Sequence, residues 1–342
     1  MSVETKDIEN VVVVGSGPAG YTAALYTSRA DLEPLVVEGF AWGGLLQQTT
    51  DVENYPGYPE GVLGPQMMEE FRRQAERFGT RFITDDATKL DLSDQPGGTH
   101  TVHVGDQEIK TRAVILAMGA EPKKLGVPGE DELAVGRGVS YCATCDAAFY
   151  RGADTIVVGG GDTAMEDASF LAKFADKVSV VHRRPQFRAS AIMLQRAKDS
   201  ENIDLVTPYV VKSFEAGDDG GPLTRAVLEN SEDGSLKELP IKGAFIAIGH
   251  RPNSQLVEDA LDLDDEGYVL VEGRTTRTKL PGVFAAGDLT DHVYRQAVTA
   301  AGTGCMAALD AEAYLRDAPI DPEAHWAGEP EKIEEAAEAA AS

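Results

Sequence analysis

Two short glycine-rich segments stand out in the sequence, each placed after a run of apolar strand-forming residues and before a helical pattern. The first follows the valine run 11–14 and begins at Gly15, whereas the second follows a similar run and begins at Gly159. Continuous apolar runs of this length indicate buried parallel strands, and the glycine turn opens the next helix. The chain is therefore expected to contain two dinucleotide-binding units of the Rossmann type.

The first glycine segment fits the pattern G-x-G-x-x-G with Gly15, Gly17 and Gly20. In this pattern the first glycine makes the tight turn, the second lets a pyrophosphate approach the backbone, and the third allows the helix to pack closely. Pro18 suits the first turn of the helix. Glu38 ends the second strand, where its carboxylate would accept hydrogen bonds from ribose hydroxyls. We expect an adenine dinucleotide here, the alternative being a structural glycine turn.

The second segment repeats the pattern in the form G-x-G-x-x-A, with Gly159, Gly161 and Ala164. No acid ends its second strand. The residues there begin at His182 and include three arginines, Arg183, Arg184 and Arg188. Guanidinium groups bind phosphate through charge-assisted hydrogen bonds, so a nucleotide with a 2′-phosphate, NADP, is preferred over NAD. The alternative is a surface charge cluster that pairs with neighbouring acids.

Cys142 and Cys145 form a C-x-x-C pattern between the two glycine segments. A structural zinc would need four ligands and no second cysteine or histidine pair lies nearby, so redox chemistry is favoured over metal binding. Two sulfurs at this spacing can cycle between a disulfide and a dithiol. Asp146 would donate or accept the accompanying proton, its alternative role being a helix cap. The solitary Cys305 is expected to be a small buried apolar residue.

Two candidate breaks, at 119–122 and 249–252, each combine a glycine with a proline after a short strand pattern. We therefore expect the second unit to be inserted into the first, giving an α/β fold of two Rossmann-like domains of three layers (ββα). A β-hairpin is expected within 85–110. The expected segments are 1–121 and 251–318 for the first domain, 122–250 for the second domain with the cysteine pair, and 319–342 for an acidic flexible tail.

The charge balance narrows the possible partners. The 342 residues include 57 acids and 31 bases, which gives a formal net charge of −26. Nucleic-acid binding is disfavoured because a polyanion must be met by clustered basic residues. We read no secretory signal and no membrane-spanning run, and three cysteines favour a reducing compartment, so a cytoplasmic protein is expected. The acidity and low lysine content favour a halophilic source, the alternative being an acidic bacterial enzyme.

Five motifs together carry a family resemblance. Their ranges are 15–24, 140–146, 159–164, 182–189 and 282–288. Together these residues closely resemble the low-molecular-weight thioredoxin reductases, flavoproteins of the pyridine nucleotide-disulfide oxidoreductase type. The resemblance runs from about residue 10 to residue 316. The cysteine pair inside the second nucleotide domain is specific to this family among related reductases.

The resemblance implies a homodimer with FAD on the first unit, NADPH on the inserted unit and a small thioredoxin as protein substrate. The residues expected to bind FAD are Gly15, Ser16, Gly17, Pro18, Ala19, Gly20, Glu38, Gly43, Gly44, Leu45, Asn54, Gly287, Asp288, Arg295, Gln296 and Ala297. Those expected to bind NADPH are Gly159, Gly161, Asp162, Thr163, Ala164, His182, Arg183, Arg184 and Arg188. Leu45 stands where the family commonly has glutamine, and Gln47 or Gln48 is expected to compensate.

The same resemblance implies the path of the electrons, from NADPH to FAD, then to the Cys142–Cys145 disulfide and then to thioredoxin. Cys142 would attack thioredoxin, Cys145 would lie nearer the flavin, and Asp146 would handle the proton. No metal is expected. The inserted domain would rotate about hinges near the two breaks. The alternatives are a flavin-dependent reductase of another small redox protein and a non-catalytic dinucleotide-binding sensor.

Overall fold

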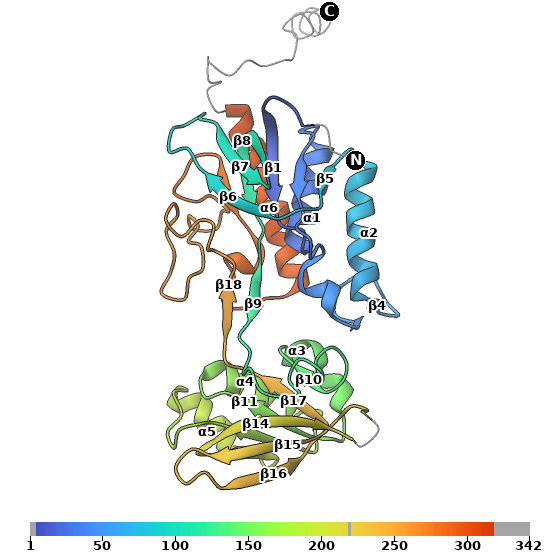
Figure 1. Cartoon of the computed structure of the whole chain (residues 1–342), viewed down its shortest axis with the longest axis vertical. Helices are drawn as coiled ribbons and strands as arrows, with labels where there is room; N and C mark the ends of the chain where they lie inside the picture. The colour runs from blue at the N-terminus through green and yellow to red at the C-terminus, as the bar shows by residue number, and fades with distance from the viewer. Residues whose placement is uncertain (1–4, 218–219, 318–342) are drawn as a thin grey trace, which may run out of the picture. The chain divides into compact units, whose positions relative to one another are not determined.

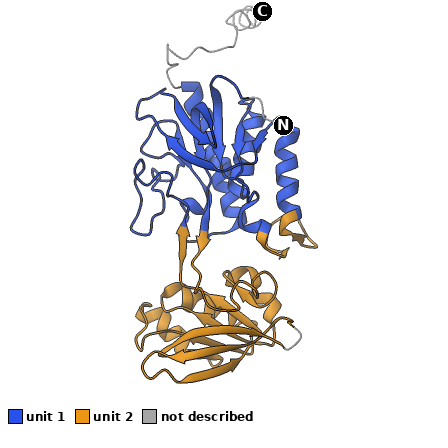
Figure 2. Ribbon diagram, in the orientation of Figure 1, with its two compact units in different colours: residues 1–47, 66–120, 252–342 blue, residues 48–65, 121–251 orange. Residues whose placement is uncertain are grey.

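The computed structural model describes residues 5–217 and 220–317, and the chain divides into two compact units (Figures 1 and 2). Unit 1 holds the described residues up to 47, those from 66 to 120 and those from 252 onward. Unit 2 holds 48–65 and 121–251. The acidic tail expected at 319–342 lies outside the described residues.

Unit 1 is built on a sheet whose strand order is β5-β2-β1-β8-β7-β6, with β19 also paired to β8. The strands β5, β2, β1, β8 and β19 pair in parallel, whereas β6 and β7 form the expected hairpin against β8. Their bounds are β1 Glu9–Val14, β2 Leu35–Val37, β5 Arg81–Ile83, β6 Ala87–Asp91, β7 His100–Val104, β8 Gln107–Leu116 and β19 Val283–Ala285.

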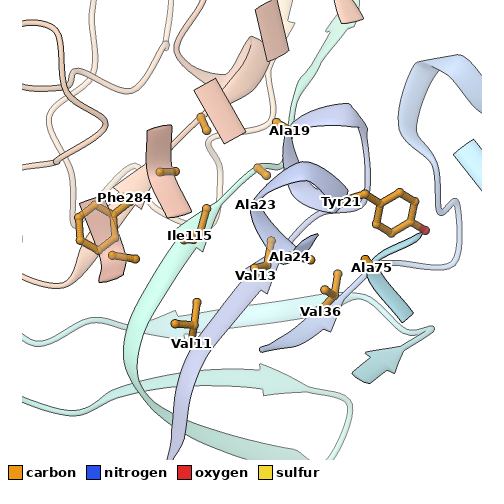
Figure 3. Close-up of a cluster of buried hydrophobic side chains, with 14 of the residues drawn as sticks. Val11, Val13, Ala19, Tyr21, Ala23, Ala24, Val36, Ala75, Ile115 and Phe284 are labelled. Carbon is orange, nitrogen blue, oxygen red and sulfur yellow. The ribbon is translucent and has the colours of Figure 1, made fainter. Parts of the chain in front are cut away.

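Two helices, α1 (Pro18–Arg29) and α6 (Ala297–Asp317), pack together in unit 1. Figure 3 shows Val13 of β1 and the α1 alanines within one buried cluster. A Cβ on Gly304 of α6 would lie 2.2 Å from the Ala19 carbonyl oxygen, so the two helix backbones are nearly in contact. The valine run of β1 is buried because both faces of the sheet are covered, as is usual for parallel sheets. The long helix α2 spans Gly64–Arg77.

Unit 2 contains a second parallel sheet in the order β10-β17-β11-β12-β13. Its bounds are β10 Val139–Ser140, β11 Asp154–Val158, β12 Lys177–Val181, β13 Ile203–Val206 and β17 Gly243–Ile246, with helices α4 Asp162–Leu171 and α5 Ala191–Asp199. The strand–turn–helix pattern that occurs twice in the sequence thus forms a strand, a glycine turn and a helix in each unit. The two parallel-sheet units confirm the α/β fold expected from the sequence.

Unit 2 also has a three-stranded antiparallel sheet, whose individual strands the sequence analysis did not locate. Its strands are β14 Tyr209–Ala216, β15 Leu223–Asn230 and β16 Leu236–Pro240. Val211, Phe214 and Leu223 of this sheet belong to one buried cluster with Val158 and Val181 of the parallel sheet. The antiparallel sheet therefore covers one face of the parallel one, as the ββα layering requires.

Besides the boundaries at 47/48 and 65/66, the chain passes between the units at β9 (Ala120–Pro122) and β18 (His250–Pro252), and these two strands pair with each other (Figure 1). Gly119 and Gly249, at φ of +71° and +98°, adopt left-handed conformations that favour glycine at these breaks. The shorter elements are β3 Asp51–Val52, β4 Val62–Leu63, α3 Ala143–Asp146 and the 3₁₀ turns η1 Gly44–Gln48, η2 Ala147–Tyr150 and η3 Gly287–Leu289.

No helix within residues 5–217 and 220–317 is both long and apolar enough to cross a membrane. The same residues contain no group of three or more His, Cys, Asp or Glu side chains that could hold a metal ion.

Candidate active site

The first glycine loop joins β1 to α1, and its three glycines have different neighbours. A Cβ on Gly15 would lie 2.2 Å from the Ala117 carbonyl oxygen, and one on Gly20 would lie 2.1 Å from the Gly15 carbonyl oxygen. Both positions therefore require glycine for packing. Gly17, the N-cap of α1, has nothing within 4 Å of its Cβ position and no side chain caps the helix. The open space lies at a helix N-terminus, where a phosphate binds well.

A second glycine turn lies against this loop. The Gly43 N–H donates to Ser16 Oγ at 3.0 Å, and Ser16 Oγ donates to the Glu38 carbonyl at 2.6 Å. A Cβ on Gly44 would lie 3.2 Å from Gly17 Cα. These contacts bring the predicted residues Ser16, Gly17, Gly43 and Gly44 together. Pro18 and Ala19 form the first turn of α1 beside them.

Leu45 follows this turn and its side chain is exposed. Gln47 Oε1, in contrast, is buried and has no hydrogen-bond partner among the described residues. It would lie 3.1 Å from a Cβ on Gly43. A buried acceptor without a partner is costly, and a donor on a bound ligand would satisfy it.

The carboxylate of Glu38 is almost completely buried and accepts four hydrogen bonds from the protein. Arg72 Nε and one terminal nitrogen donate at 2.9 Å and 3.1 Å, the Tyr21 hydroxyl at 3.0 Å and Thr84 Oγ1 at 2.5 Å. A ribose hydroxyl would have to share these oxygens, so the ribose role of Glu38 stays a prediction. Sequence reasoning missed Arg72, since nothing in the pattern of α2 distinguishes it from Arg73.

Asp288 is the most strongly perturbed acid in this part of unit 1. Its Oδ1 is buried without a partner among the described residues. Burial and the neighbouring Asp291 raise the pKa of Asp288 to about 7, while Arg295 opposes the shift. Gly287, at φ +74°, lies against α1, because its Cβ would be 2.9 Å from Ala19 Cβ. Asp288 is thus held beside the first glycine loop and needs a hydrogen-bond donor.

The segment before α6 is ordered by Asp291. Its carboxylate accepts the N–H groups of Val293, Tyr294 and Arg295 at 2.8–3.0 Å. Arg295 adopts φ +47°, and Gln296 leads directly into α6, which begins at Ala297. Asn54 belongs to the segment 48–65 of unit 2. The expected contact of Asn54 with the flavin stays a prediction.

The second glycine loop, in unit 2, is packed in the same way as the first. A Cβ on Gly159 would lie 2.4 Å from the Ala247 carbonyl oxygen and 2.8 Å from Ala164 Cβ, so the third position of the motif packs directly on the first. Gly161 is the N-cap of α4 and has nothing within 4 Å of its Cβ position. Asp162 and Thr163 form the first turn of α4. This helix also begins with open space above its N-cap.

The arginine segment is attached to this second loop. The Arg188 and Ala189 N–H groups donate to the Gly160 carbonyl at 2.7 Å and 3.1 Å, and the Ser190 N–H donates to Asp162 Oδ1 at 2.6 Å. His182 is buried against Gly160 and stacks on Phe187 at 5.1 Å between ring centroids. The loop and the arginine segment therefore form one surface.

The charge around His182 is strongly positive. Burial lowers the pKa of His182, and Arg183, Arg188 and Arg184 lower it further. These three arginines are exposed, and no salt bridge among the described residues involves them. Pairing with neighbouring acids, the alternative considered for this cluster, is therefore not observed in that part of the chain.

Cys142 and Cys145 form a disulfide, with 5.3 Å between their Cα atoms. Cys142 is the N-cap of α3, and its Sγ accepts the Cys145 N–H at 3.2 Å. Cys142 is half-buried, whereas Cys145 is exposed. The third cysteine, Cys305, is free and half-buried, so the expectation that it would be a small buried residue is wrong in its degree of burial. It lies beside Tyr26 on the outer side of the α1–α6 pair.

Asp146 follows the disulfide and does not cap the next turn, η2, through its side chain. Burial raises the pKa of Asp146, and a hydrogen bond with the Ser140 side chain lowers it. The Asp146 N–H donates to the Cys142 carbonyl at 3.2 Å. Burial and the charge of Asp146 also raise the pKa of Tyr150, to about 12. The carboxyl group can therefore hold or release a proton close to the disulfide.

The segment that leads to the disulfide is anchored by a second acid that sequence reasoning missed. Glu130 is buried and accepts the N–H groups of Leu125 and Gly126 at 2.9 Å and 2.7 Å. The Tyr141 hydroxyl donates to the same carboxylate at 3.1 Å. Glu130 thus fixes the residue next to Cys142. Its contacts are set by the folded loop, which leaves no spacing pattern in the sequence.

Two glycine loops typical of dinucleotide binding and a disulfide between cysteines with a sequence separation of 3 define a dinucleotide-dependent disulfide oxidoreductase. The model of the pyridine nucleotide-disulphide oxidoreductase family matches residues 9–304. The chain belongs to this family. That match spans both glycine loops, the cysteine pair and the segment around Asp288.

Similar proteins share most of the chain. A thioredoxin reductase of Mycolicibacterium smegmatis is 52% identical over 314 residues, which cover 92% of this chain and 98% of that protein. A bifunctional thioredoxin reductase/thioredoxin of Mycobacterium leprae is also 52% identical, and the match covers 66% of its length. The crystal structure of thioredoxin reductase from Streptococcus pyogenes superimposes with a TM-score of 0.83 at 38% identity, over 90% of this chain and 98% of that one.

Proposed function

We propose that this chain is an NADPH-dependent thioredoxin reductase, a flavoprotein oxidoreductase. The observation that carries the proposal is the Cys142–Cys145 disulfide, which lies in the same unit as the second glycine loop. The relatives that bear the name thioredoxin reductase support the substrate class, because they are about half identical over nearly their full length.

The residues of unit 1 fit FAD. Gly17 leaves open space at the N-terminus of α1 for a pyrophosphate, and the buried acceptors Asp288 Oδ1 and Gln47 Oε1 would receive donors from the ribityl and ring regions. The remaining contacts with FAD are those that the family resemblance implies. When bound there, FAD would supply two-electron redox chemistry between a nicotinamide and a disulfide.

The residues of unit 2 fit NADPH in the same way. Gly161 leaves open space at the N-terminus of α4, and the exposed guanidinium groups of Arg183, Arg184 and Arg188 would bind the 2′-phosphate. His182 is buried and stacked on Phe187 beside this surface, and its Nε2 has no hydrogen-bond partner among the described residues. A carboxylate at the end of β12 would repel that phosphate, and the sequence has none there.

In the reduced protein the chemistry is thiol–disulfide exchange. The Cys142 thiolate attacks one sulfur of the thioredoxin disulfide, forming a mixed disulfide and releasing the other substrate sulfur as a thiolate that takes up a proton. The Cys145 thiolate then attacks Cys142 Sγ, which restores the Cys142–Cys145 disulfide and releases the second substrate thiolate to be protonated. Two electrons and two protons reach thioredoxin. Asp146 holds and delivers a proton beside this pair.

The homodimer would form through the outer face of the α1–α6 pair. This face exposes several large apolar side chains, Tyr26, Val298, Met306 and Leu309. Apolar patches on helices commonly mark interfaces between subunits. Analytical ultracentrifugation tests this assignment. The protein should sediment as a dimer, and Leu309→Glu should convert it to a monomer.

We place the enzyme in the cytoplasm, where a thiol-reducing enzyme has both NADPH and reducible partners. We also propose a halophilic source. With a net charge of −26, the excess acidic side chains repel one another in dilute buffer. Salt screens this repulsion. The melting temperature should therefore rise between 0.1 M and 2 M KCl. A melting temperature that is unchanged or falls over this range contradicts the halophilic assignment.

The function is tested by anaerobic titration of the flavin-loaded protein. NADPH should bleach the flavin absorbance and oxidised thioredoxin should restore it, with NADH bleaching it only at much higher concentration. Unchanged absorbance with both nucleotides would support a non-catalytic sensor. Bleaching by NADPH without recovery by any thioredoxin would support a reductase of another small redox protein.

A further inference from the structure

Phe40 lies at the edge of the unit 1 sheet from which the first glycine loop also emerges. Strands β1 and β2 pair in parallel, with Val14 opposite Val37, so the segments that follow them leave the sheet on the same side. In sheets of this kind the pyrophosphate lies on the first turn and the ribose at the end of the second strand. The adenine, which the ribose carries, would then lie beside the residues that follow Glu38.

The backbone of Phe40 is held in place by the segment that follows β5. The Gly39 N–H donates to the Asp85 carbonyl at 3.2 Å, and the Phe40 N–H donates to Asp86 Oδ1 at 3.1 Å. Gly39 adopts φ +76°, and a Cβ there would lie 3.0 Å from Asp86 Oδ1, so the two segments are in close contact. These hydrogen bonds fix the point from which the Phe40 ring projects.

The ring of Phe40 is not packed into the protein. Phe40 is 69% exposed, whereas Trp42, two residues further on, packs against the buried cluster around β1 and α1. Single exposed apolar residues are common on protein surfaces. Phe40 differs from an ordinary surface residue because its backbone is fixed and it lies at the nucleotide edge of the sheet. It therefore presents a large apolar face where a base is expected.

The neighbouring carboxylate has little capacity left for the adenosine. Glu38 Oε2 accepts hydrogen bonds from Tyr21 and Arg72, and Oε1 accepts hydrogen bonds from Arg72 and Thr84. An ionised carboxylate has about four lone-pair sites, and these protein donors occupy all of them. A ribose hydroxyl would have to displace or share one of these donors. Affinity for the adenosine half must therefore come largely from contacts that need no acceptor on Glu38.

We infer that the Phe40 ring stacks on the adenine of FAD and supplies affinity for the adenosine half of the cofactor. This inference rests on the proposed function. Every base has a π face, and an aromatic side chain stacks on it in an offset arrangement that needs no hydrogen bond. Phe40 is thus a binding residue that lies outside the glycine pattern.

The experiment measures the Kd of FAD for the full chain after its flavin has been removed, by isothermal titration calorimetry. Phe40→Ala should raise this Kd by roughly fivefold to a hundredfold, the range that base–aromatic stacking gives on alanine substitution. Phe40→Leu keeps an apolar side chain without a ring face and should show most of this loss. Phe40→Tyr and Phe40→Trp keep the ring face and should restore the parent Kd to within about twofold.

Phe78→Ala is the matched control. Phe78 is another exposed aromatic residue of unit 1, but it precedes β5 and therefore lies at the amino end of that strand, away from the glycine loop. Its removal should leave the Kd of FAD unchanged. FMN, which lacks the adenosine half, is the control ligand. At millimolar FMN the rise in melting temperature should be the same in the parent and in Phe40→Ala, whereas the rise with FAD should be smaller in Phe40→Ala.

The flavin-free Phe40→Ala protein should melt at the parent temperature, because the side chain that it loses is exposed. If this variant does not fold, the comparison of Phe40→Leu with Phe40→Tyr decides the question. A Kd of FAD for Phe40→Ala or Phe40→Leu that equals the parent value overturns the inference, as does an equal loss of FAD and FMN binding. A parent chain that binds FAD while Phe40→Ala loses nothing contradicts this inference alone. A parent chain that binds no FAD contradicts the proposed function as well.

Discussion

The carboxylate of Glu38 and the guanidinium of Arg72 form a bidentate ion pair, with hydrogen bonds of 2.9 Å and 3.1 Å. The Glu38 side chain is 1% exposed and that of Arg72 is 27% exposed. The Arg72 guanidinium also lies 4.2 Å from the centre of the Phe82 ring. This pair fixes the end of β2 to α2 next to the first glycine loop.

Arg72→Met should destabilise the protein by about 3 kcal/mol, because it leaves a buried carboxylate without its charged partner. Chemical denaturation monitored by circular dichroism measures this difference. Arg73→Met, the exposed neighbour, is the control and should change the free energy of unfolding by less than about 0.5 kcal/mol. Equal effects of the two substitutions would show that the ion pair contributes nothing specific.

The stability of unit 1 should depend on pH through His100. This side chain is fully buried, and burial lowers its pKa from 6.5 to about 4. The unfolded chain takes up a proton below pH 6.5, whereas the folded chain does so only near pH 4. Stability present above pH 6.5 is therefore lost as the pH falls to 4, by about 3 kcal/mol. His100→Gln should flatten this part of the profile of unfolding free energy; a profile parallel to the parent would contradict the assignment.

Gly17→Ala and Gly20→Ala should separate flavin binding from folding. Gly17 has φ −70° and open space at its Cβ position, so Ala should change the stability of the flavin-free protein by less than about 1 kcal/mol, yet lower the flavin content. Gly20→Ala would place a methyl 2.1 Å from a carbonyl oxygen and should cost about 3 kcal/mol or more. Thermal unfolding and the ratio of flavin to protein absorbance measure both effects. The reverse order of stabilities is the result that would refute this reading.

Arg184→Gln should raise KM for NADPH by roughly tenfold to a hundredfold, since a hydrogen bond between charged groups contributes about 1.5–3 kcal/mol. KM for NADH, which lacks the 2′-phosphate, should not change. Steady-state kinetics with both nucleotides test this. Arg196→Gln on α5, also exposed, is the matched control. A proportional rise for both nucleotides would show that Arg184 does not read the 2′-phosphate.

Cys142→Ser should keep the bleaching of the flavin by NADPH and reduce thioredoxin turnover to background, because the sulfur assigned to attack the substrate disulfide is removed and the remaining Cys145 thiol has no partner with which to resolve a mixed disulfide. Thiol titration provides the control. In Cys305→Ser, reduction should still release two thiols, whereas in Cys142→Ser it should release none. Retained thioredoxin turnover in Cys142→Ser would overturn the role given to this residue.

Features encoded by local spacing were predictable. The valine run 11–14 and the glycines after it specify a buried strand, a tight turn and a helix with few residues, and the same is true of the repeat at Gly159. The pairing of Cys142 with Cys145 is equally local. Each of these features depends on residues only a few positions apart, so the sequence displays them directly.

Features that depend on contacts between distant segments were not predictable. The four donors to Glu38 come from α1, α2 and the residue after β5, and no periodic pattern links Thr84 to Glu38. The strands β14, β15 and β16 were not located in the sequence because they are amphipathic and partly exposed, so they lack the continuous apolar runs of the parallel strands.

The pairing of β9 with β18 brings the two ends of the segment 121–251 next to each other. A segment with adjacent ends can be exchanged as a cassette without stretching the host chain. Grafting the corresponding block from a relative at these two strands should transfer the thiol pair and the proposed NADPH-binding residues together, and should leave the proposed FAD-binding unit of the recipient protein unchanged.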